Sequence, residues 1–202
     1  MSAVLELRSL VARATHAPLD LALARAERAA LVAPNATGKS SILRCIVGSL
    51  SPVAGSLSVR GRVGYAPQSY SASLFSWLTA RQNIELAARN LPRLAAHDAI
   101  DRALFVAQLH RSRLDSLPDH LSGGQRQLVS LARSIAFDPE ILLLDEPFSA
   151  LDDGARRAVI SRLDALLLDR ACSLVLVSHL DADSIALGAR RVALSPSSER
   201  AA

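Results

Sequence analysis

The stretch from Ala33 to Ser41, which reads A-P-N-A-T-G-K-S-S, constrains the fold of this chain more than any other feature. It follows an apolar run over residues 29–32 with the pattern of a buried strand, and it precedes apolar residues at helical spacing over 42–50. Such a strand-loop-helix unit with the pattern G-x-x-x-x-G-K-[ST] holds phosphates on its backbone N–H groups. The sequence therefore predicts a phosphate-binding loop, although Ala33 stands at the first glycine of the pattern and Ala36 is a second departure.

Lys39 is the only lysine of the chain, whereas the other 22 basic residues are arginines. A compact ammonium fits between phosphate oxygens where a planar guanidinium does not, so we expect Lys39 to reach the terminal phosphates. The Ser40 hydroxyl is a candidate ligand of Mg²⁺. The alternative is a capped turn before an ordinary helix. The candidate nucleotide-binding residues here are Asn35, Ala36, Thr37, Gly38, Lys39, Ser40 and Ser41.

Length and composition limit the choices further. A chain of 202 residues is large enough for one α/β domain, and we expect one domain with an insertion. No apolar run approaches the roughly 18 residues that span a bilayer, and the N-terminus lacks the pattern of a secretion signal, so we expect a cytoplasmic location. Cys45 and Cys172 lie in apolar patterns, which indicates two reduced core thiols and no metal site.

A net charge of +4 and a pI of about 9.8 could indicate binding to nucleic acid. The arginines are scattered among acidic residues, however, which indicates a solvated surface. Only seven aromatic residues are present, too few to favour a stacking platform for single strands. We therefore expect no nucleic-acid partner.

Hydrophobic periodicity predicts the order of the elements. Strands are expected over residues 4–10, 19–25, 29–32, 56–59, 62–65, 141–144, 173–177 and 192–194. Besides the helix after the phosphate loop, helices are expected over residues 80–89, 98–109 and 155–168, with another that residues 121–125 open and Pro139 ends. The fold class is α/β, with a mainly parallel sheet, a small N-terminal antiparallel layer and an all-helical insertion. We assign residues 1–68 and 121–195 to the core, 69–120 to the insertion and 196–202 to a loose tail.

The string L-S-G-G-Q at residues 121–125 is the second informative feature. Ser122 and the glycine N–H groups at a helix N-terminus can form another anion site, and neither Gly123 nor Gly124 has a side chain that would block a phosphate. Together with the phosphate loop, this unsubstituted string resembles the signature of ATP-binding-cassette (ABC) ATPases. The resemblance covers essentially the whole length of the chain.

The resemblance implies an ATP-hydrolysing subunit whose two copies sandwich two ATP molecules head to tail. The signature residues Ser122, Gly123, Gly124 and Gln125 would then contact the γ-phosphate held by the other copy. Asp152 matches the loop that crosses this homodimer.

The resemblance also assigns roles at the ends of the predicted strands, where ligands bind in such sheets. Asp145 resembles the carboxylate that holds Mg²⁺ through water, and Glu146 resembles the general base. Gln68 matches the glutamine that senses Mg²⁺ and the γ-phosphate, and His179 matches the histidine that contacts the γ-phosphate. Taken one by one, each of these residues could instead belong to a solvated turn, a loop or the core. Lys39, Glu146 and His179 are thus the catalytic candidates, and Ser40, Gln68 and Asp145 are the metal candidates.

Three departures from the family pattern concern nucleotide affinity. The aromatic residue that stacks on adenine, expected near Ala14, is absent, and His16 is the candidate substitute. Ala33 and Ala36 would each cost about 1 to 2 kcal/mol if they adopted a left-handed backbone conformation. We therefore expect weaker ATP binding with the catalytic groups intact.

The expected function is to power a separate integral membrane permease, from the cytoplasmic face of the membrane, by ATP-driven dimerisation. Residues 74–86 are similar to importers of nitrate, sulfonates and taurine, which would add a solute-binding protein through the permease. Phe75, Trp77 and Leu78 would line the groove that receives the permease, although a core role is an equal alternative. Two other functions stay open: a soluble ABC ATPase that acts outside transport, and a nucleotide-binding regulatory subunit that does not hydrolyse ATP.

Overall fold

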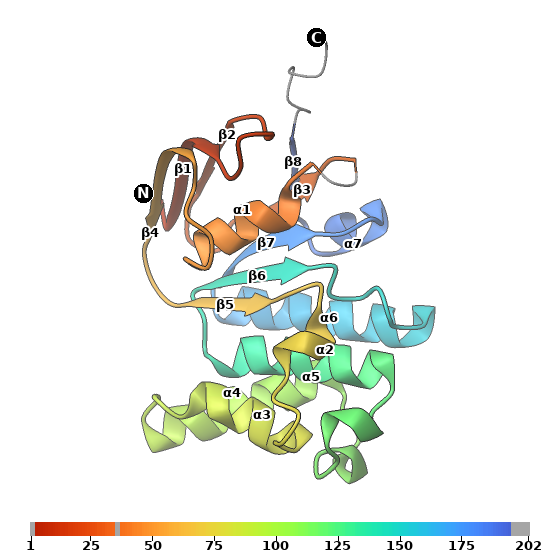
Figure 1. Ribbon diagram of the computed structural model, residues 1–202. Helices are drawn as coiled ribbons and strands as arrows, with labels where there is room; N and C mark the ends of the chain where they lie inside the picture. Colours follow the sequence, from red (N-terminus) through yellow and green to blue (C-terminus); the bar gives the residue numbers. More distant parts are fainter. Residues whose placement is uncertain (1–2, 35–36, 195–202) are drawn as a thin grey trace.

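A computed structural model describes residues 3–34 and 37–194. Asn35, Ala36 and the predicted tail therefore lie outside the described residues. The structure has a five-stranded sheet with helices on both faces and a small three-stranded sheet above α1 (Lys39–Ile46) (Figure 1). The α/β class predicted from the sequence is confirmed.

The larger sheet is parallel throughout, in the order β5-β6-β7-β3-β8. Its strands are β5 (Val63–Ala66), β6 (Ile141–Asp145), β7 (Ser173–Val177), β3 (Arg28–Val32) and β8 (Arg190–Ala193). Every residue of β6 and β7 is buried, which explains why their sequences are continuous apolar runs without alternation. Because the strands are parallel, the loops after β3, β5, β6 and β7 all leave from the same edge.

The smaller sheet is antiparallel, in the order β2-β1-β4. It consists of β1 (Leu5–Val11), β2 (Leu19–Leu23) and β4 (Ala54–Val59). Alternate leucines of β1 and β2 point to α1 and, with Ile42 and Leu43 of that helix, form a core against one face of the parallel sheet. The two strands predicted over residues 56–59 and 62–65 are consecutive in the chain but belong to different sheets. β4 pairs in this antiparallel sheet, and β5 pairs in the parallel sheet.

The other face of the parallel sheet is covered by α5 (Gly123–Ala136) and α6 (Asp153–Asp169). α3 (Ala80–Ala88) and α4 (Arg93–Ala107) lie outside α5, so the segment predicted as an insertion adds a further helical layer (Figure 1). The remaining helices are short: α2 (Tyr70–Ser73), α7 (Asp181–Ala186) and two 3₁₀ turns, η1 (Arg111–Arg113) and η2 (Pro118–His120).

The prediction for α4 was wrong at its start, which lies five residues before residue 98. Pro92 is the N-cap and cannot extend a helix backwards, which sets the true start. The side chain of Leu94 in the first turn is 81% exposed, so the apolar periodicity did not reveal that turn. In the described ranges, no helix combines the length and apolarity needed to cross a membrane.

Candidate functional site

A cavity of about 460 Å³ opens at the edge where the parallel strands end. This volume lies within the usual range of small-molecule sites. It brings together residues from five separate loops, the start of α1 and the ends of β6 and β7. Its lining consists of Arg13, His16, Thr37, Gly38, Lys39, Ser40, Ser41, Gln68, Asp145, Glu146, Val177 and His179.

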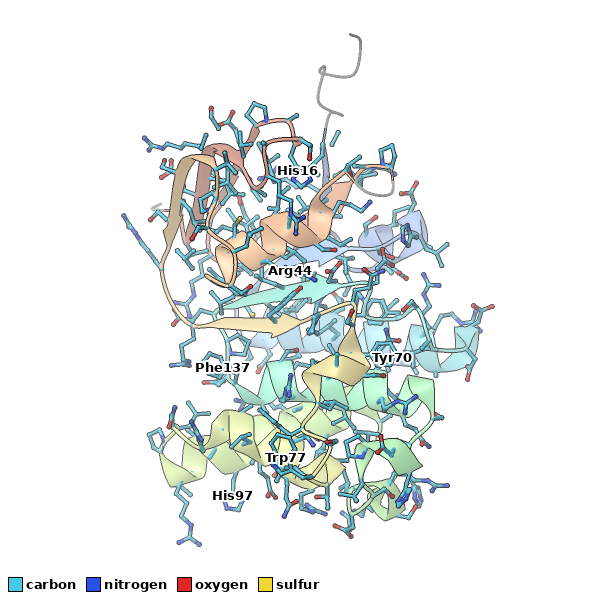
Figure 2. The ribbon with its side chains drawn as sticks, in the orientation of Figure 1. His16, Arg44, Tyr70, Trp77, His97 and Phe137 are labelled. Atoms are coloured by element: carbon cyan, nitrogen blue, oxygen red, sulfur yellow. The ribbon has the colours of Figure 1, made fainter. Side chains whose placement is uncertain are left out.

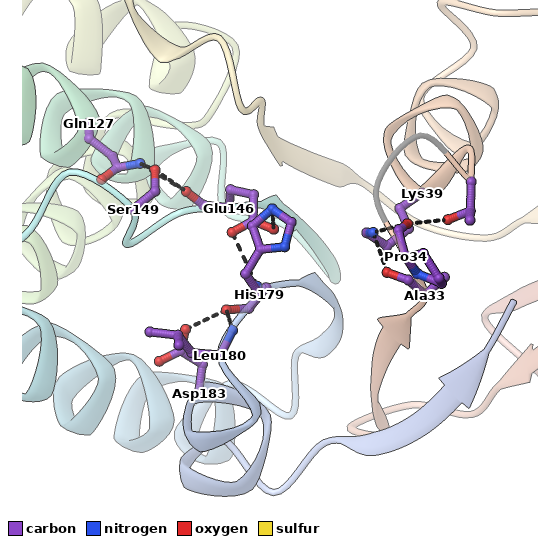
Figure 3. A network of polar contacts seen from close by, with 11 residues as sticks. Ala33, Pro34, Lys39, Gln127, Glu146, Ser149, His179, Leu180 and Asp183 are labelled. Carbon is purple, nitrogen blue, oxygen red and sulfur yellow. Dashed lines mark hydrogen bonds and ion pairs between the residues drawn. The ribbon is translucent and has the colours of Figure 1, made fainter.

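The phosphate loop forms one wall of this cavity. Gly38 has φ +97°, a left-handed conformation that glycine adopts without strain, and a Cβ here would lie 2.3 Å from Cε1 of His16. Lys39 is only 8% exposed. Its ammonium donates to the backbone carbonyls of Ala33 (2.7 Å) and Pro34 (2.9 Å) (Figure 3). Ala33 is not among the described non-glycine residues with positive φ, so the strain considered for it does not arise. The same expectation for Ala36 lies outside the described residues.

Asp145 closes β6 and is almost fully buried. Burial raises the pKa of this carboxyl, while interactions with Ser40 and Arg44 act in the opposite direction. The Tyr65 hydroxyl lies 3.5 Å from Oδ2, and burial followed by the charge of Asp145 raises the pKa of Tyr65 to about 12. Oδ1 of Asp145 is buried without a hydrogen-bond partner. An uncompensated carboxylate oxygen beside a serine hydroxyl fits a hard cation such as Mg²⁺.

Glu146 follows directly and has φ +52°, an uncommon backbone angle for glutamate. Its backbone N–H donates to the Val177 carbonyl at 2.9 Å. Its carboxylate is 3.2 Å from Nε2 of His179 and accepts the backbone N–H of His179 at 3.3 Å (Figure 3). Burial raises the pKa of the Glu146 carboxyl, and the neighbouring His179 lowers it. The carboxylate is thereby held next to the histidine at the cavity wall.

The hydroxyl of Ser178 fixes the loop that carries His179. The Ser178 hydroxyl donates to Oδ2 of Asp183 at 2.5 Å and accepts the backbone N–H of Leu180 at 3.2 Å. Asp183 is buried and pairs with Arg156 of α6. The His179 side chain itself is about half exposed, so it is free to face a ligand in the cavity.

Gln68 lies two residues after β5, and its backbone contributes a hydrogen bond that lowers the pKa of Asp145. Within the described residues, no three His, Cys, Asp or Glu side chains gather as a metal cluster. A cation at this edge would therefore depend on mixed oxygen ligands of the kind that Ser40, Gln68 and Asp145 offer. This donor set suits Mg²⁺ better than a transition metal.

His16, the candidate for the adenine contact, lies beside the phosphate loop and near the start of α1 (Figure 2). Burial and the charge of Arg13 lower the pKa of its imidazole, and its Nδ1 is buried without a hydrogen-bond partner. Arg13 lines the same cavity, although no motif indicated it. His16 therefore lines this cavity beside Gly38, in the part of the loop expected to hold phosphates, and its contact with adenine stays a prediction.

The signature segment does not line this cavity in the part of the chain that the structure describes. Ser122 is the N-cap of α5, where its hydroxyl accepts the Gln125 N–H while the Gln125 side chain accepts the Ser122 N–H. A Cβ on Gly124 would lie 2.8 Å from the Ala150 carbonyl oxygen, so the helix start packs closely on the loop before α6. Asp152 caps α6 by accepting the Ala155 N–H, and it too lies outside the cavity lining.

Sequence reasoning missed Gln127, which donates from Nε2 to the Glu146 carbonyl at 2.9 Å (Figure 3). A signal was present, because Gln127 shares the buried face of α5 with Leu131 and Ile135 at intervals of four residues. A buried glutamine on an apolar stripe indicates a specific hydrogen-bond partner.

Comparisons with known proteins agree with this geometry. The sequence model of the ABC transporter family matches residues 17–149. The chain is 34% identical over 196 residues to the thiamine import ATP-binding protein ThiQ of Salmonella paratyphi A, covering 89% of this chain and 82% of that protein. It is 37% identical over 174 residues to the sulfate/thiosulfate import ATP-binding protein CysA of Thermosynechococcus vestitus, covering 80% of this chain and 51% of that protein.

Solved structures show the same fold. A metal-chelate type ABC transporter in an inward-facing conformation matches with a TM-score of 0.79 at 27% identity, over 97% of this chain and 81% of that one. A dimeric bacterial ABC transporter cassette matches with a TM-score of 0.81 at 23% identity, over 94% of both chains.

Proposed function

This chain belongs to the ABC transporter family, in which it is an ATP-hydrolysing subunit, and from that premise we propose how its residues bind and cleave ATP. The triphosphate lies in the cavity along the start of α1. Thr37, Gly38, Ser40 and Ser41 surround it there, and the helix N-terminus favours its negative charge.

Lys39 supplies the positive charge that the phosphates require. Its ammonium already lies inside the loop, bound only to backbone carbonyls, so it can exchange these for phosphate oxygens without rebuilding the wall. Ser40, Gln68 and Asp145 hold the Mg²⁺, which neutralises charge on the phosphates when bound.

Glu146 polarises the attacking water, and His179 contacts the γ-phosphate. A general base acts best when its pKa lies nearer to the working pH, and burial shifts the Glu146 carboxyl in that direction. Its contact with His179 aligns the two groups on one side of the cavity. In this arrangement the nucleophile is the water next to Glu146, and the electrophile is the γ-phosphate that His179 contacts.

The site is completed by a second copy of this chain. Ser122, Gly123, Gly124 and Gln125 of each copy contact the nucleotide of the other, and Asp152 crosses the interface beside them. The position of the signature segment outside its own cavity supports this arrangement.

The transporter is an importer, and its permease is a separate chain that binds this subunit at the cytoplasmic face of the membrane. The curated relatives named above support import, since both are named as import ATP-binding proteins. The docking surface includes Phe75 and Trp77, whose rings lie 5.3 Å apart, and Trp77 is 72% exposed (Figure 2). A solute-binding protein acts through the permease.

The observation that carries this proposal is the convergence of Lys39, Asp145, Glu146 and His179 on one cavity. We expect Lys39→Ala to abolish ATP turnover, because no other lysine exists in the chain and the phosphate loop loses its ammonium. Phosphate release from Mg²⁺ and ATP measures this. Arg8→Ala removes an exposed cation on β1 and serves as the control, with turnover unchanged. Turnover of the Lys39 variant within about twofold of the parent would exclude the phosphate-loop assignment.

A further inference from the structure

Gln127 is a buried residue whose side-chain amide makes all of its hydrogen bonds to one short segment of the chain. It is 3% exposed on α5. Its Nε2 donates to the Glu146 carbonyl (2.9 Å) and to the Ser149 hydroxyl (3.0 Å), and its Oε1 accepts the Ala150 N–H (2.8 Å) (Figure 3). All three partners lie in the segment that follows β6. The side chain is therefore committed to holding that segment.

The segment needs such support because the backbone of Glu146 is strained. Its φ of +52° lies in the left-handed region, which is unfavourable for a non-glycine residue because the Cβ comes close to the following carbonyl oxygen. Such a conformation persists only where its surroundings fix it. The N–H of Glu146 donates to the Val177 carbonyl on β7, and its C=O accepts from Gln127 Nε2 at 2.9 Å and from the Ser149 hydroxyl at 3.2 Å. Gln127 also contacts that Ser149 hydroxyl, so it supports the Glu146 carbonyl both directly and through Ser149. The backbone that directs the Glu146 side chain is therefore held by both β7 and α5.

The same amide ties the Glu146 segment to the signature segment. Gly124 and Gln127 lie one turn apart on α5, and both contact Ala150: Gln127 by its hydrogen bond, and Gly124 through the close approach that a Cβ would block. The first turn of α5 and the loop before α6 thus form one packed unit. A shift of the first turn of α5 or of the loop before α6 would therefore move the groups that hydrogen-bond to the Glu146 carbonyl.

We propose that Gln127 is a positioning residue for hydrolysis, which holds the Glu146 carboxylate in register with the cavity and links it to the signature segment of the same chain. The proposal rests on the assigned role of Glu146 as the general base. Gln127 is not among the residues that line the cavity. Its loss should therefore affect the chemical step and leave binding intact.

Gln127→Leu tests this, because leucine fits a buried helix position and removes all three hydrogen bonds. We expect kcat to fall at least tenfold, since a displacement of about 1 Å at a catalytic group can cost about 100-fold. KM for ATP should stay within about threefold of the parent, because the phosphate loop is not touched. With hydrolysis stalled, Mg²⁺ and ATP should cause the variant to accumulate as a dimer in gel filtration. Gln127→Met is the second variant if the leucine protein does not fold.

Ser134→Ala is the matched control. Ser134 lies on the same helix and is 4% exposed, but its hydroxyl donates only to the Leu131 carbonyl of its own helix. Its kcat and KM should equal those of the parent.

Two results would overturn the proposal. One is a kcat within about twofold of the parent. The other is a fall in kcat together with loss of the ATP-dependent dimer, which would indicate general damage to the signature helix. Neither result bears on the phosphate loop. Failure of the proposed function would appear separately, as normal turnover by Lys39→Ala.

Discussion

Asp145 and Glu146 are adjacent, buried and acidic, and the fold treats their two side chains differently. The Asp145 carboxylate lies beside the Tyr65 hydroxyl, 3.5 Å from Oδ2, whereas the Glu146 carboxylate accepts the backbone N–H of His179 and lies 3.2 Å from its Nε2. Each carboxylate also has one buried oxygen without a hydrogen-bond partner. These different surroundings support the different roles proposed for the two groups, cation binding for Asp145 and proton transfer for Glu146.

The two cysteines illustrate how burial controls reactivity at this scale. Both are buried, and burial raises the pKa of Cys45 and raises that of Cys172 to about 12. Since the thiolate is the reactive form, we expect neither to react within minutes with a thiol reagent at pH 8 in the folded protein. Both should react at once in denaturant. Absorbance with a chromogenic disulfide reagent measures this, and rapid labelling of one thiol in the native state would contradict the burial.

The sequence located Asp145 at the end of β6 and His179 shortly after β7, because the pattern of apolar runs showed where each strand stops. Lys39, the first residue of α1, was located by the phosphate-loop motif. The sequence did not locate Gln127 or Asp183, whose partners Glu146 and Arg156 lie 19 and 27 residues away in sequence and depend on how the helices pack. The local pattern indicated that Gln127 is buried but not which group it contacts.

At the scale of elements, strand positions were predictable to within two residues, whereas sheet membership was not. β4 and β5 are consecutive and equally short, yet they pair in different sheets. The short helices α2 and α7 were missed, since four or six residues provide too little periodicity. The division into core, insertion and tail stays a prediction.

The buried ion pair between Arg156 of α6 and Asp183 of α7 should contribute to stability. Asp183→Ala leaves Arg156, whose side chain is 14% exposed, without its carboxylate, and it frees the Ser178 hydroxyl. Breaking one partner of a buried ion pair costs about 3 to 5 kcal/mol of unfolding free energy. Urea unfolding should show that loss.

The exposed pair of Glu6 and Arg8 on β1 is the control. Glu6→Ala should change the unfolding free energy by less than about 1 kcal/mol, as is usual for surface pairs. An equally small effect for Asp183→Ala would mean that the pair does not anchor the loop of His179.

At the scale of the whole molecule, the proposed function divides each ATP site between two copies of the chain. The phosphate loop and the proposed catalytic residues line the cavity, while the signature segment and Asp152 lie elsewhere within the described residues. Under this proposal a second copy is needed to close each site. ATP binding and association should therefore be coupled, and hydrolysis should release the dimer.

The most direct test of this account is the mass of the Glu146→Gln protein in solution. The glutamine removes the base but leaves the phosphate loop, His179 and the signature segment untouched, so ATP should bind without being cleaved. Light scattering after gel filtration should give about twice the 21.5 kDa of one chain with Mg²⁺ and ATP, and a monomer with Mg²⁺ and ADP. A monomer under both conditions, from a parent protein that hydrolyses ATP, would contradict the sandwich and with it the assigned role of the signature segment.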